Sequence, residues 1–201
     1  MAVQYAVKAE VVNIQFDTPQ KDDIFLVDTN VWYWLTYTQA STSAKSYQIK
    51  DYPAYLGKII PDQERLLYCG LSLAELAHTI EQAERKIFST TITPKDYRHN
   101  EPTERANVVA EVITAWGQVT SMAGPTDVTI DETTTKESLT RFQTQLLDGY
   151  DLLILEAMDK AGVVQVITDD GDYVTVPGIK VFTANLNVIT AARNQGKLIT
   201  R

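Results

Sequence analysis

The chain has 201 residues, of which 44% are hydrophobic, and this length and composition are typical of one α/β domain with extensions. A formal charge of −8 at pH 7 argues against broad non-specific attraction to nucleic acid, because phosphate binding normally depends on lysine and arginine. The single cysteine, Cys69, excludes an internal disulfide framework, and the lack of a membrane-length apolar run or a signal peptide predicts a cytoplasmic protein with no membrane partner.

The first third of the chain predicts an extension followed by the start of the core. Residues 1–22 should contain an irregular strand, with a polar linker at its end. The apolar run 24–27 predicts a strand that is covered on both faces, and a helix should follow from about Thr29. Residues 38–53 predict a loop that leads into a short helix near 54–60.

The rest of the chain alternates helices and strands. Apolar spacing predicts a helix over Ser72–Phe88, a connection over 89–102 and a helix over 103–122. Gly124-Pro125 ends that helix, and a threonine-rich loop should follow. Two further helices are predicted at 136–147 and 149–161. A strand at 163–167, a loop at 168–178 and a strand at 179–182 should follow, and a terminal helix should end at about Arg193.

This alternation of strands and helices predicts a three-layer α/β/α fold, with a central parallel sheet and helices on both faces. The predicted division of the chain is an N-terminal extension at 1–22, a main domain at 23–195 and a C-terminal tail at 196–201.

Four acidic residues follow predicted strands or open predicted helices: Asp28, Glu75, Asp151 and Asp170. Open α/β sheets place ligands at the carboxyl ends of their strands, so one fold can direct all four side chains into a single cleft. Two unit charges about 4 Å apart repel by roughly 4 kcal/mol at an effective dielectric of about 20. A protein usually retains such a cluster for function, with cations or protons to neutralise it.

Each acid also has a purely structural explanation when it is taken alone. Asp28 can cap the helix that follows it, and Ser72-Leu-Ala-Glu75 matches a capping box. Asp148 can cap the helix that carries Asp151, and the acids in 168–173 can belong to a polar turn. The combination of all four motifs favours a site.

That combination resembles the PIN domain, the nuclease fold of VapC-type toxins and of many RNA-processing enzymes. The likeness runs from about residue 23 to 190, with the motifs in the family's order, at 25–31, 73–76, 148–157 and 167–173. The last of these is similar to the family's pattern of threonine, any residue, aspartate, any residue, aspartate and an aromatic residue, which Thr168, Asp170, Asp172 and Tyr173 match. The resemblance implies a central parallel sheet, dependence on magnesium or manganese, and hydrolysis of RNA or occasionally DNA.

Carried over by position, the resemblance assigns a catalytic and metal-binding quartet: Asp28, Glu75, Asp151 and Asp170. Asp172 matches an additional metal-binding acid, whereas Asp169 occupies a variable position and is left out. Thr29 and Asn30 should support Asp28 by hydrogen bonding. Hard oxygen ligands of this kind select Mg²⁺ or Mn²⁺.

The sequence therefore predicts a metal-dependent endoribonuclease, with an RNA substrate that is either single-stranded or structured. The resemblance is compatible with the toxin of a type II toxin–antitoxin pair, with an antitoxin protein as partner, and a homodimer is expected. Two alternatives remain open. One is a non-catalytic PIN-like scaffold that binds RNA or protein, and the other is a phosphatase of the haloacid dehalogenase type, which needs a second aspartate where this chain has Asn30.

Among the aromatic residues, Tyr37, Tyr47 and Tyr52 are candidates for contacts with a base. His78 lies one turn after Glu75 and is expected to be a partly buried polar residue of the helix rather than a substrate contact.

Overall fold

The structure is a computed structural model that describes residues 3–201, and within them a single parallel sheet of seven strands runs through the molecule. The spatial order of the strands is β4-β3-β2-β5-β6-β1-β7. Their bounds are Glu10–Asn13 for β1, Phe25–Val27 for β2, Leu66–Cys69 for β3, Gly124–Thr126 for β4, Gln165–Ile167 for β5, Lys180–Thr183 for β6 and Leu198–Ile199 for β7.

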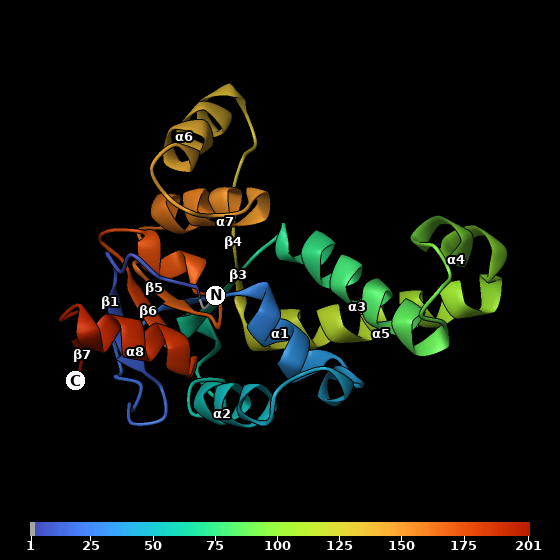
Figure 1. Cartoon of the computed structure of the whole chain (residues 1–201), viewed down its shortest axis with the longest axis horizontal. Coiled ribbons are helices and arrows are strands. Elements are labelled where there is room, and N and C mark those ends of the chain that lie inside the picture. Colours follow the sequence, from blue (N-terminus) through green and yellow to red (C-terminus); the bar gives the residue numbers. More distant parts are fainter. Residues whose placement is uncertain (1–2) are drawn as a thin grey trace.

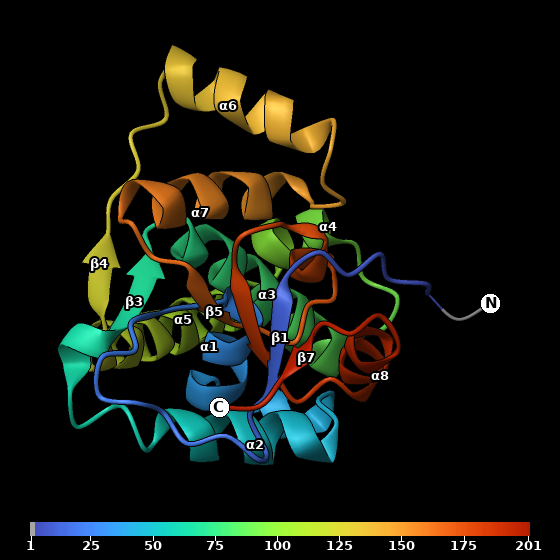
Figure 2. The same cartoon turned by 90° about the vertical axis from the view of Figure 1, so that its left-hand side faces the viewer.

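Helices cover both faces of this sheet (Figure 2). Their bounds are Thr29–Thr36 for α1, Ser46–Leu56 for α2, Ser72–Phe88 for α3, Pro94–Asn100 for α4, Pro102–Met122 for α5, Glu132–Phe142 for α6, Gly149–Lys160 for α7 and Leu186–Asn194 for α8. Short 3₁₀ turns lie at Ala40–Thr42, Gln63–Arg65 and Asp172–Thr175. Across residues 3–201, none of the helices combines the length and the apolar character needed to traverse a bilayer.

The alternation of side chains along the strands creates two cores. Phe25 and Val27 of β2 face a core shared with α1, α2, α3 and α5, whereas Leu26 faces a core shared with α7 and α8. Neighbouring residues of a strand point to opposite faces, and a strand buried on both faces therefore has no polar positions. The predicted three-layer architecture with a central parallel sheet is confirmed.

Two parts of the chain extend beyond the three layers. Helices α3, α4 and α5 form an arm that projects away from the sheet in Figure 1, where α4 lies at the far end. Helix α6 lies outside α7, on the side of α7 that faces away from the sheet (Figure 2).

The path of the chain reverses direction across the sheet between β2 and β5. From β2 the chain proceeds through β3 to β4 at one edge, and it then crosses back through α6 and α7 to β5 on the other side of β2. Open α/β sheets bind their ligands outside the carboxyl ends of the strands at such a switch point. The fold therefore indicates a site next to the ends of β2 and β5.

Most predicted elements are present, with some errors at the boundaries. The prediction for Ser72–Phe88 is confirmed, whereas the loop predicted at 38–53 is wrong because α2 already begins at Ser46. Pro53 lies inside α2, where buried Tyr52 and Tyr55 hold the helix against the sheet. The threonine-rich loop is also shorter than predicted, because the Asp131 side chain caps α6 by accepting a hydrogen bond from the Thr134 N–H at 2.8 Å.

Other elements were not predicted at all. The connection at 89–102 contains α4, and β3, β4 and β7 lie in segments for which no strand was predicted. The segments predicted as an N-terminal extension and a C-terminal tail contribute β1 and β7, which pair with each other in the sheet. The division of the chain into an extension, a main domain and a tail stays a prediction.

A buried ion-pair cluster fixes the end of β7 to the linker before β2. The Arg201 guanidinium donates to Asp17 Oδ1 and Oδ2 at 2.9 Å and to Asp23 Oδ1 at 2.7 Å, and it lies 4.4 Å from the centroid of the Phe182 ring. The two carboxylate side chains are only 2% and 5% exposed. Burial opposes ionisation of Asp23, but hydrogen bonds from Arg201, the Gln20 N–H and Gln165 lower its pKa.

We expect Arg201→Ala to lower the free energy of unfolding by about 3 kcal/mol at pH 7, because it leaves two buried carboxylates without their cation. Urea unfolding measures this change, with Arg193→Ala, an exposed arginine of α8, as the control. The contribution of Asp23 is present above the unfolded pKa of about 4 and is lost as the pH falls through the lowered folded pKa. The difference between wild type and Arg201→Ala should therefore shrink in acid, and equal stabilities at pH 7 would contradict the role of this cluster.

Candidate functional site

The candidate site lies at the carboxyl ends of β2 and β5, where these strands are paired in register. Val27 pairs with Ile167, and the Asp28 N–H donates to the Ile167 carbonyl at 3.1 Å. The first residues beyond the two strands, Asp28 and Thr168, are consequently neighbours. Parallel pairing of short buried strands thus sets the position of the first acid.

Asp28 is held by three hydrogen bonds. Its Oδ1 accepts from the Thr29 N–H at 2.6 Å, so the side chain caps α1, as the structural explanation proposed. Its Oδ2 accepts from the Asn30 side-chain amide at 2.6 Å and from the Thr168 hydroxyl at 2.5 Å. Because the carboxylate is 3% exposed, these donors fix its orientation while solvent has little access to it.

The turn after β5 presents the next two acids. The Thr168 hydroxyl accepts from the Asp170 N–H at 2.8 Å, and Asp170 Oδ1 accepts from the Asp172 N–H at 2.8 Å. Thr168 therefore connects Asp28 to the backbone that carries Asp170. Asp170 and Asp172 are both partly exposed at the mouth of the site.

The start of α7 brings a further pair of acids to the same edge. Asp148 caps this helix by accepting from the N–H groups of Tyr150 and Asp151, at 2.9 and 3.1 Å. Asp151 is 4% exposed, and its Oδ1 accepts from the Tyr173 hydroxyl at 2.9 Å. The predicted cap at Asp148 is confirmed, and it directs Asp151 inward.

Glu75, in the first turn of α3, does not form the capping box that the sequence suggested. The N-cap residue is Leu71, and no side-chain bond caps this helix. Glu75 Oε2 and the Thr29 hydroxyl are both buried without a hydrogen bond of normal geometry, although Thr29 lies close enough to Glu75 to oppose the rise of its pKa. An unpaired buried carboxylate oxygen is costly, which favours a ligand-binding role over a structural one for this residue.

The acids act on one another electrostatically. Burial raises the pKa of Asp28 to about 8, and the charges of Glu75 and Asp170 add to the increase, against the hydrogen bonds from Thr168 and the Thr29 N–H. Burial likewise raises the pKa of Asp151 to about 9, with further contributions from Asp28, Asp148 and Asp170. The pKa values of Glu75, Asp170 and Asp172 are raised by the same two causes, burial and neighbouring carboxylates.

The donor chemistry of this cluster suits a hard divalent cation, since its members are all carboxylates and Glu75 Oε2 is buried without a hydrogen-bond partner. Among residues 3–201, however, no three His, Cys, Asp or Glu side chains are arranged so that they could hold a metal ion. The acids thus share an electrostatic field without a preformed coordination sphere. Mutually repelling carboxylates would have to turn towards an entering cation.

The predicted supporting residues have unequal roles. Asn30 donates its side-chain amide to Asp28, whereas Thr29 contributes its backbone N–H. Sequence reasoning missed Thr168 and Tyr173 as partners of the acids, although both belong to the motif at 167–173. It also gave no place to Asp169, whose carboxylate accepts from Tyr47, Gln48 and Tyr52 and so ties α2 to this turn.

The tyrosines proposed as base contacts are occupied elsewhere. Tyr52 is fully buried, and the hydroxyl of buried Tyr37 donates to Glu84 at 2.6 Å. Tyr47 is bound to Asp169 at 2.9 Å. His78 is exposed rather than partly buried, and its Nε2 lies 2.5 Å from the side-chain nitrogen of Gln82.

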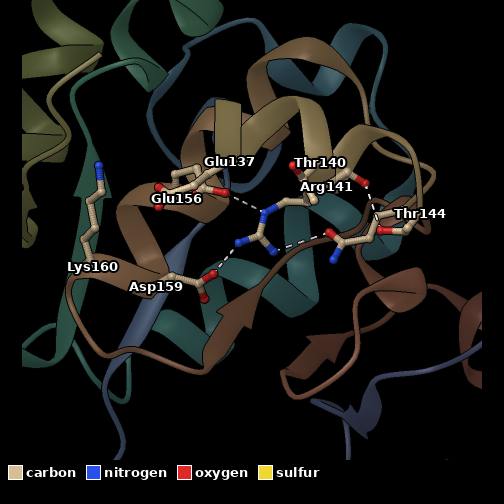
Figure 3. A pocket seen from close by; sticks show the side chains of 8 residues that line it. Glu137, Thr140, Arg141, Thr144, Glu156, Asp159 and Lys160 are labelled. Atoms are coloured by element: carbon tan, nitrogen blue, oxygen red, sulfur yellow. Dashed lines mark hydrogen bonds and ion pairs between the residues drawn. The ribbon is translucent and has the colours of Figure 1, made fainter. Parts of the chain in front are cut away.

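A separate cavity of about 600 Å³ lies between α6 and α7 and contains none of the proposed site acids. Figure 3 shows Arg141 reaching into it, bound to Glu156 and Asp159. Arg141 also donates to Gln145 Oε1 at 3.4 Å. The guanidinium is thus paired within the protein, and the cavity is assigned a structural role in joining α6 to α7.

Comparisons with known proteins identify remote structural likenesses. No protein-family model matches the chain, and no curated protein matches it. The crystal structure of PAE2754 from Pyrobaculum aerophilum is similar at 16% identity and a TM-score of 0.46, over 87% of this chain and 99% of that one. The structure of FitAB bound to an IR36 DNA fragment is similar at 13% identity and a TM-score of 0.40, over 80% of this chain and 95% of that one.

Likenesses this remote leave the function to be argued from the site itself. The layers and the parallel sheet described above agree with the PIN-like fold that the sequence motifs implied.

We expect Asp151→Asn to stabilise the protein in cation-free buffer at pH 8, by roughly 1–3 kcal/mol, because the Asp151 carboxyl is ionised in the unfolded chain and must take up a proton on folding, whereas an amide has no such cost. The pKa of Asp151 is about 4 in the unfolded chain and is raised to about 9 in the folded protein. The stability that this carboxyl contributes is therefore complete below pH 4 and is lost as the pH rises towards 9. The wild-type unfolding free energy should therefore fall between pH 5 and 9, and more steeply than that of Asp151→Asn.

Urea unfolding at several pH values in the presence of EDTA measures both slopes. Asp62→Asn, at an exposed position outside the cluster, serves as the matched control and should keep the wild-type slope. Identical slopes for wild type and Asp151→Asn would show that the cluster carries no electrostatic cost.

Proposed function

We propose that this protein is a divalent-cation-dependent endoribonuclease that hydrolyses phosphodiester bonds of RNA. The observation that supports the proposal most directly is the electrostatic influence of Asp28, Glu75, Asp151 and Asp170 on one another, with raised pKa values for all four. Helix capping explains only part of this cluster, because Asp28 caps α1, whereas Glu75 caps nothing and Asp148 rather than Asp151 caps α7.

The proposed roles follow from how each side chain is held. Asp28, fixed by three donors, is the rigid ligand of the set, and Glu75 offers its unpaired Oε2. Asp151 and Asp170 complete the cluster, and Asp172 lies at its more exposed side. Mg²⁺ or Mn²⁺ is the cofactor that all-oxygen donors favour, and when bound it would lower the pKa of a water and offset charge on the phosphate.

The acidity of the chain is consistent with this proposal when the cation is counted. Repulsion between a phosphate and the acids would otherwise oppose substrate binding, and bound cations reverse the local charge. Hydrogen bonds that hold Asp28 and Asp170 at fixed positions reduce the reorganisation needed when a cation enters.

Neither alternative is favoured by a specific feature of the site. A haloacid dehalogenase-type phosphatase needs a second carboxyl group at position 30, whereas the amide of Asn30 is used as a donor to Asp28 and has no proton to transfer as an acid. A non-catalytic scaffold would gain nothing from buried repelling acids. The antitoxin partner and the homodimer, which follow from the PIN resemblance alone, stay predictions.

We expect Asp28→Asn to reduce Mn²⁺- or Mg²⁺-dependent cleavage of single-stranded RNA by at least about 100-fold, since it removes a charged ligand from the centre of the cluster. Gel-resolved cleavage of a labelled RNA measures the rate, and isothermal titration with MnCl₂ measures cation binding. Asp62→Asn is the matched control and should keep wild-type activity.

Circular dichroism should show that Asp28→Asn remains folded, which separates loss of chemistry from loss of structure. If the wild-type protein neither binds these cations nor cleaves RNA, the nuclease proposal is rejected and the scaffold hypothesis replaces it.

Thr168→Val should lower the cleavage rate by roughly 10–100-fold, because it removes the hydroxyl that orients both Asp28 and the Asp170 backbone. Thr168→Ser retains the hydroxyl and should recover most of the activity. Steady-state kinetics at saturating Mn²⁺ distinguish the two variants, and equal rates for both would exclude an orienting role for this hydroxyl.

A further inference from the structure

We propose that Tyr5, from the segment before β1, forms one wall of the acidic site and donates a hydrogen bond to a phosphate of the bound RNA. This inference rests on the proposed nuclease function and assigns a substrate-binding residue to it. It also gives the N-terminal segment, which lies outside the four acidic motifs, a part in the site.

The segment at residues 5–9 is anchored beside the turn that carries Asp170 and Asp172. The N–H groups of Lys8 and Ala9 donate to the Val174 carbonyl, at 2.7 and 3.0 Å. The Gln195 side chain, just after α8, donates to the Tyr5 carbonyl at 2.8 Å and accepts from the Val7 N–H at 3.0 Å. Figure 2 shows this blue segment next to the orange-red loop that follows β5.

Gly171 makes room for the Tyr5 ring. Its backbone angles, φ −75° and ψ −12°, are available to any residue, and the local conformation does not require a glycine. A Cβ at this position would lie 2.2 Å from Tyr5 Cε1, 2.3 Å from Cζ and 2.6 Å from the hydroxyl oxygen. The hydroxyl end of Tyr5 therefore occupies the space of the missing side chain, between Asp170 and Asp172 in the sequence.

The Tyr5 hydroxyl is available to a ligand. Within residues 3–201 it makes no hydrogen bond to the protein, whereas the hydroxyls of Tyr47 and Tyr173 donate to carboxylates. A phenol has an ordinary pKa of about 10, so at neutral pH it keeps its proton and is a donor.

A neutral donor suits this position chemically. The acids accept hydrogen bonds and repel phosphate, so a phosphodiester near them needs a donor that does not neutralise a metal-binding carboxylate, as a lysine or arginine would. Lys8, three residues along the segment, points elsewhere, with its Nζ 3.4 Å from the Thr144 carbonyl. Tyr5 is thus the donor of this segment that borders Asp170 and Asp172.

The test is Tyr5→Phe, which removes the hydroxyl and retains the ring. We expect KM for single-stranded RNA to rise about tenfold with kcat within about threefold of wild type, because a hydrogen bond to a charged group is lost on binding. Tyr68→Phe, which changes a tyrosine of β3 packed against Trp116, is the matched control and should leave both constants unchanged.

Gly171→Ala provides a second variant that acts on the same contact from the other side. Its methyl group should displace the Tyr5 ring, so KM should rise by a similar factor, and the double variant Tyr5→Phe/Gly171→Ala should show little further increase. Fluorescence anisotropy with a labelled RNA in the Asp28→Asn background measures the same loss of binding without cleavage.

The outcomes separate this inference from the proposed function. A wild-type protein with no cleavage and no Mn²⁺ binding rejects both. An active wild type whose KM is unchanged by Tyr5→Phe rejects the role of Tyr5 and leaves the acidic site intact.

Discussion

The in-register parallel pairing of β2 with β5 is the constraint on which the candidate site depends. It places Asp28 beside Thr168, and the Thr168 hydroxyl then connects the carboxylate of one strand end to the backbone of the other. The chain reverses its course across the sheet at this point, and the first turns of α3 and α7 carry Glu75 and Asp151 to the same site. A shift of one residue in this pairing would turn Asp28 away from its donors.

The site is costly in stability, and the cost is concentrated at one edge of the sheet. Buried carboxylates raise one another's pKa values there, while at the amino-terminal end of β2 the equally buried Asp17 and Asp23 are neutralised by Arg201. The contrast is informative, because the same residue type has a cationic partner where it serves the fold and lacks one where we propose chemistry. Polar groups that are buried without partners are unusual in proteins and tend to occur at functional sites.

The segments outside the PIN-like motifs are integrated into the fold rather than appended to it. β1 lies between β6 and β7, and the residues before it are bound to the turn after β5 and to Gln195. The same sheet extension that adds two strands thereby carries Tyr5 to Gly171. The strands that widen the sheet are therefore connected, through the segment before β1, to the turn that carries the acidic residues.

The sequence by itself determined the layers of the fold, the long helix at Ser72–Phe88 and the four acids, because apolar periodicity and residues at strand ends are local signals. The tertiary structure decided which local interpretation of each acid holds: Asp28 and Asp148 cap helices, whereas Glu75 does not. It also decided that α2 continues through Pro53 and that Asp169 holds tyrosines of that helix. The contact of Tyr5 with Gly171 joins positions far apart in the chain, and only packing brings them together, so no pattern in the sequence could have shown it.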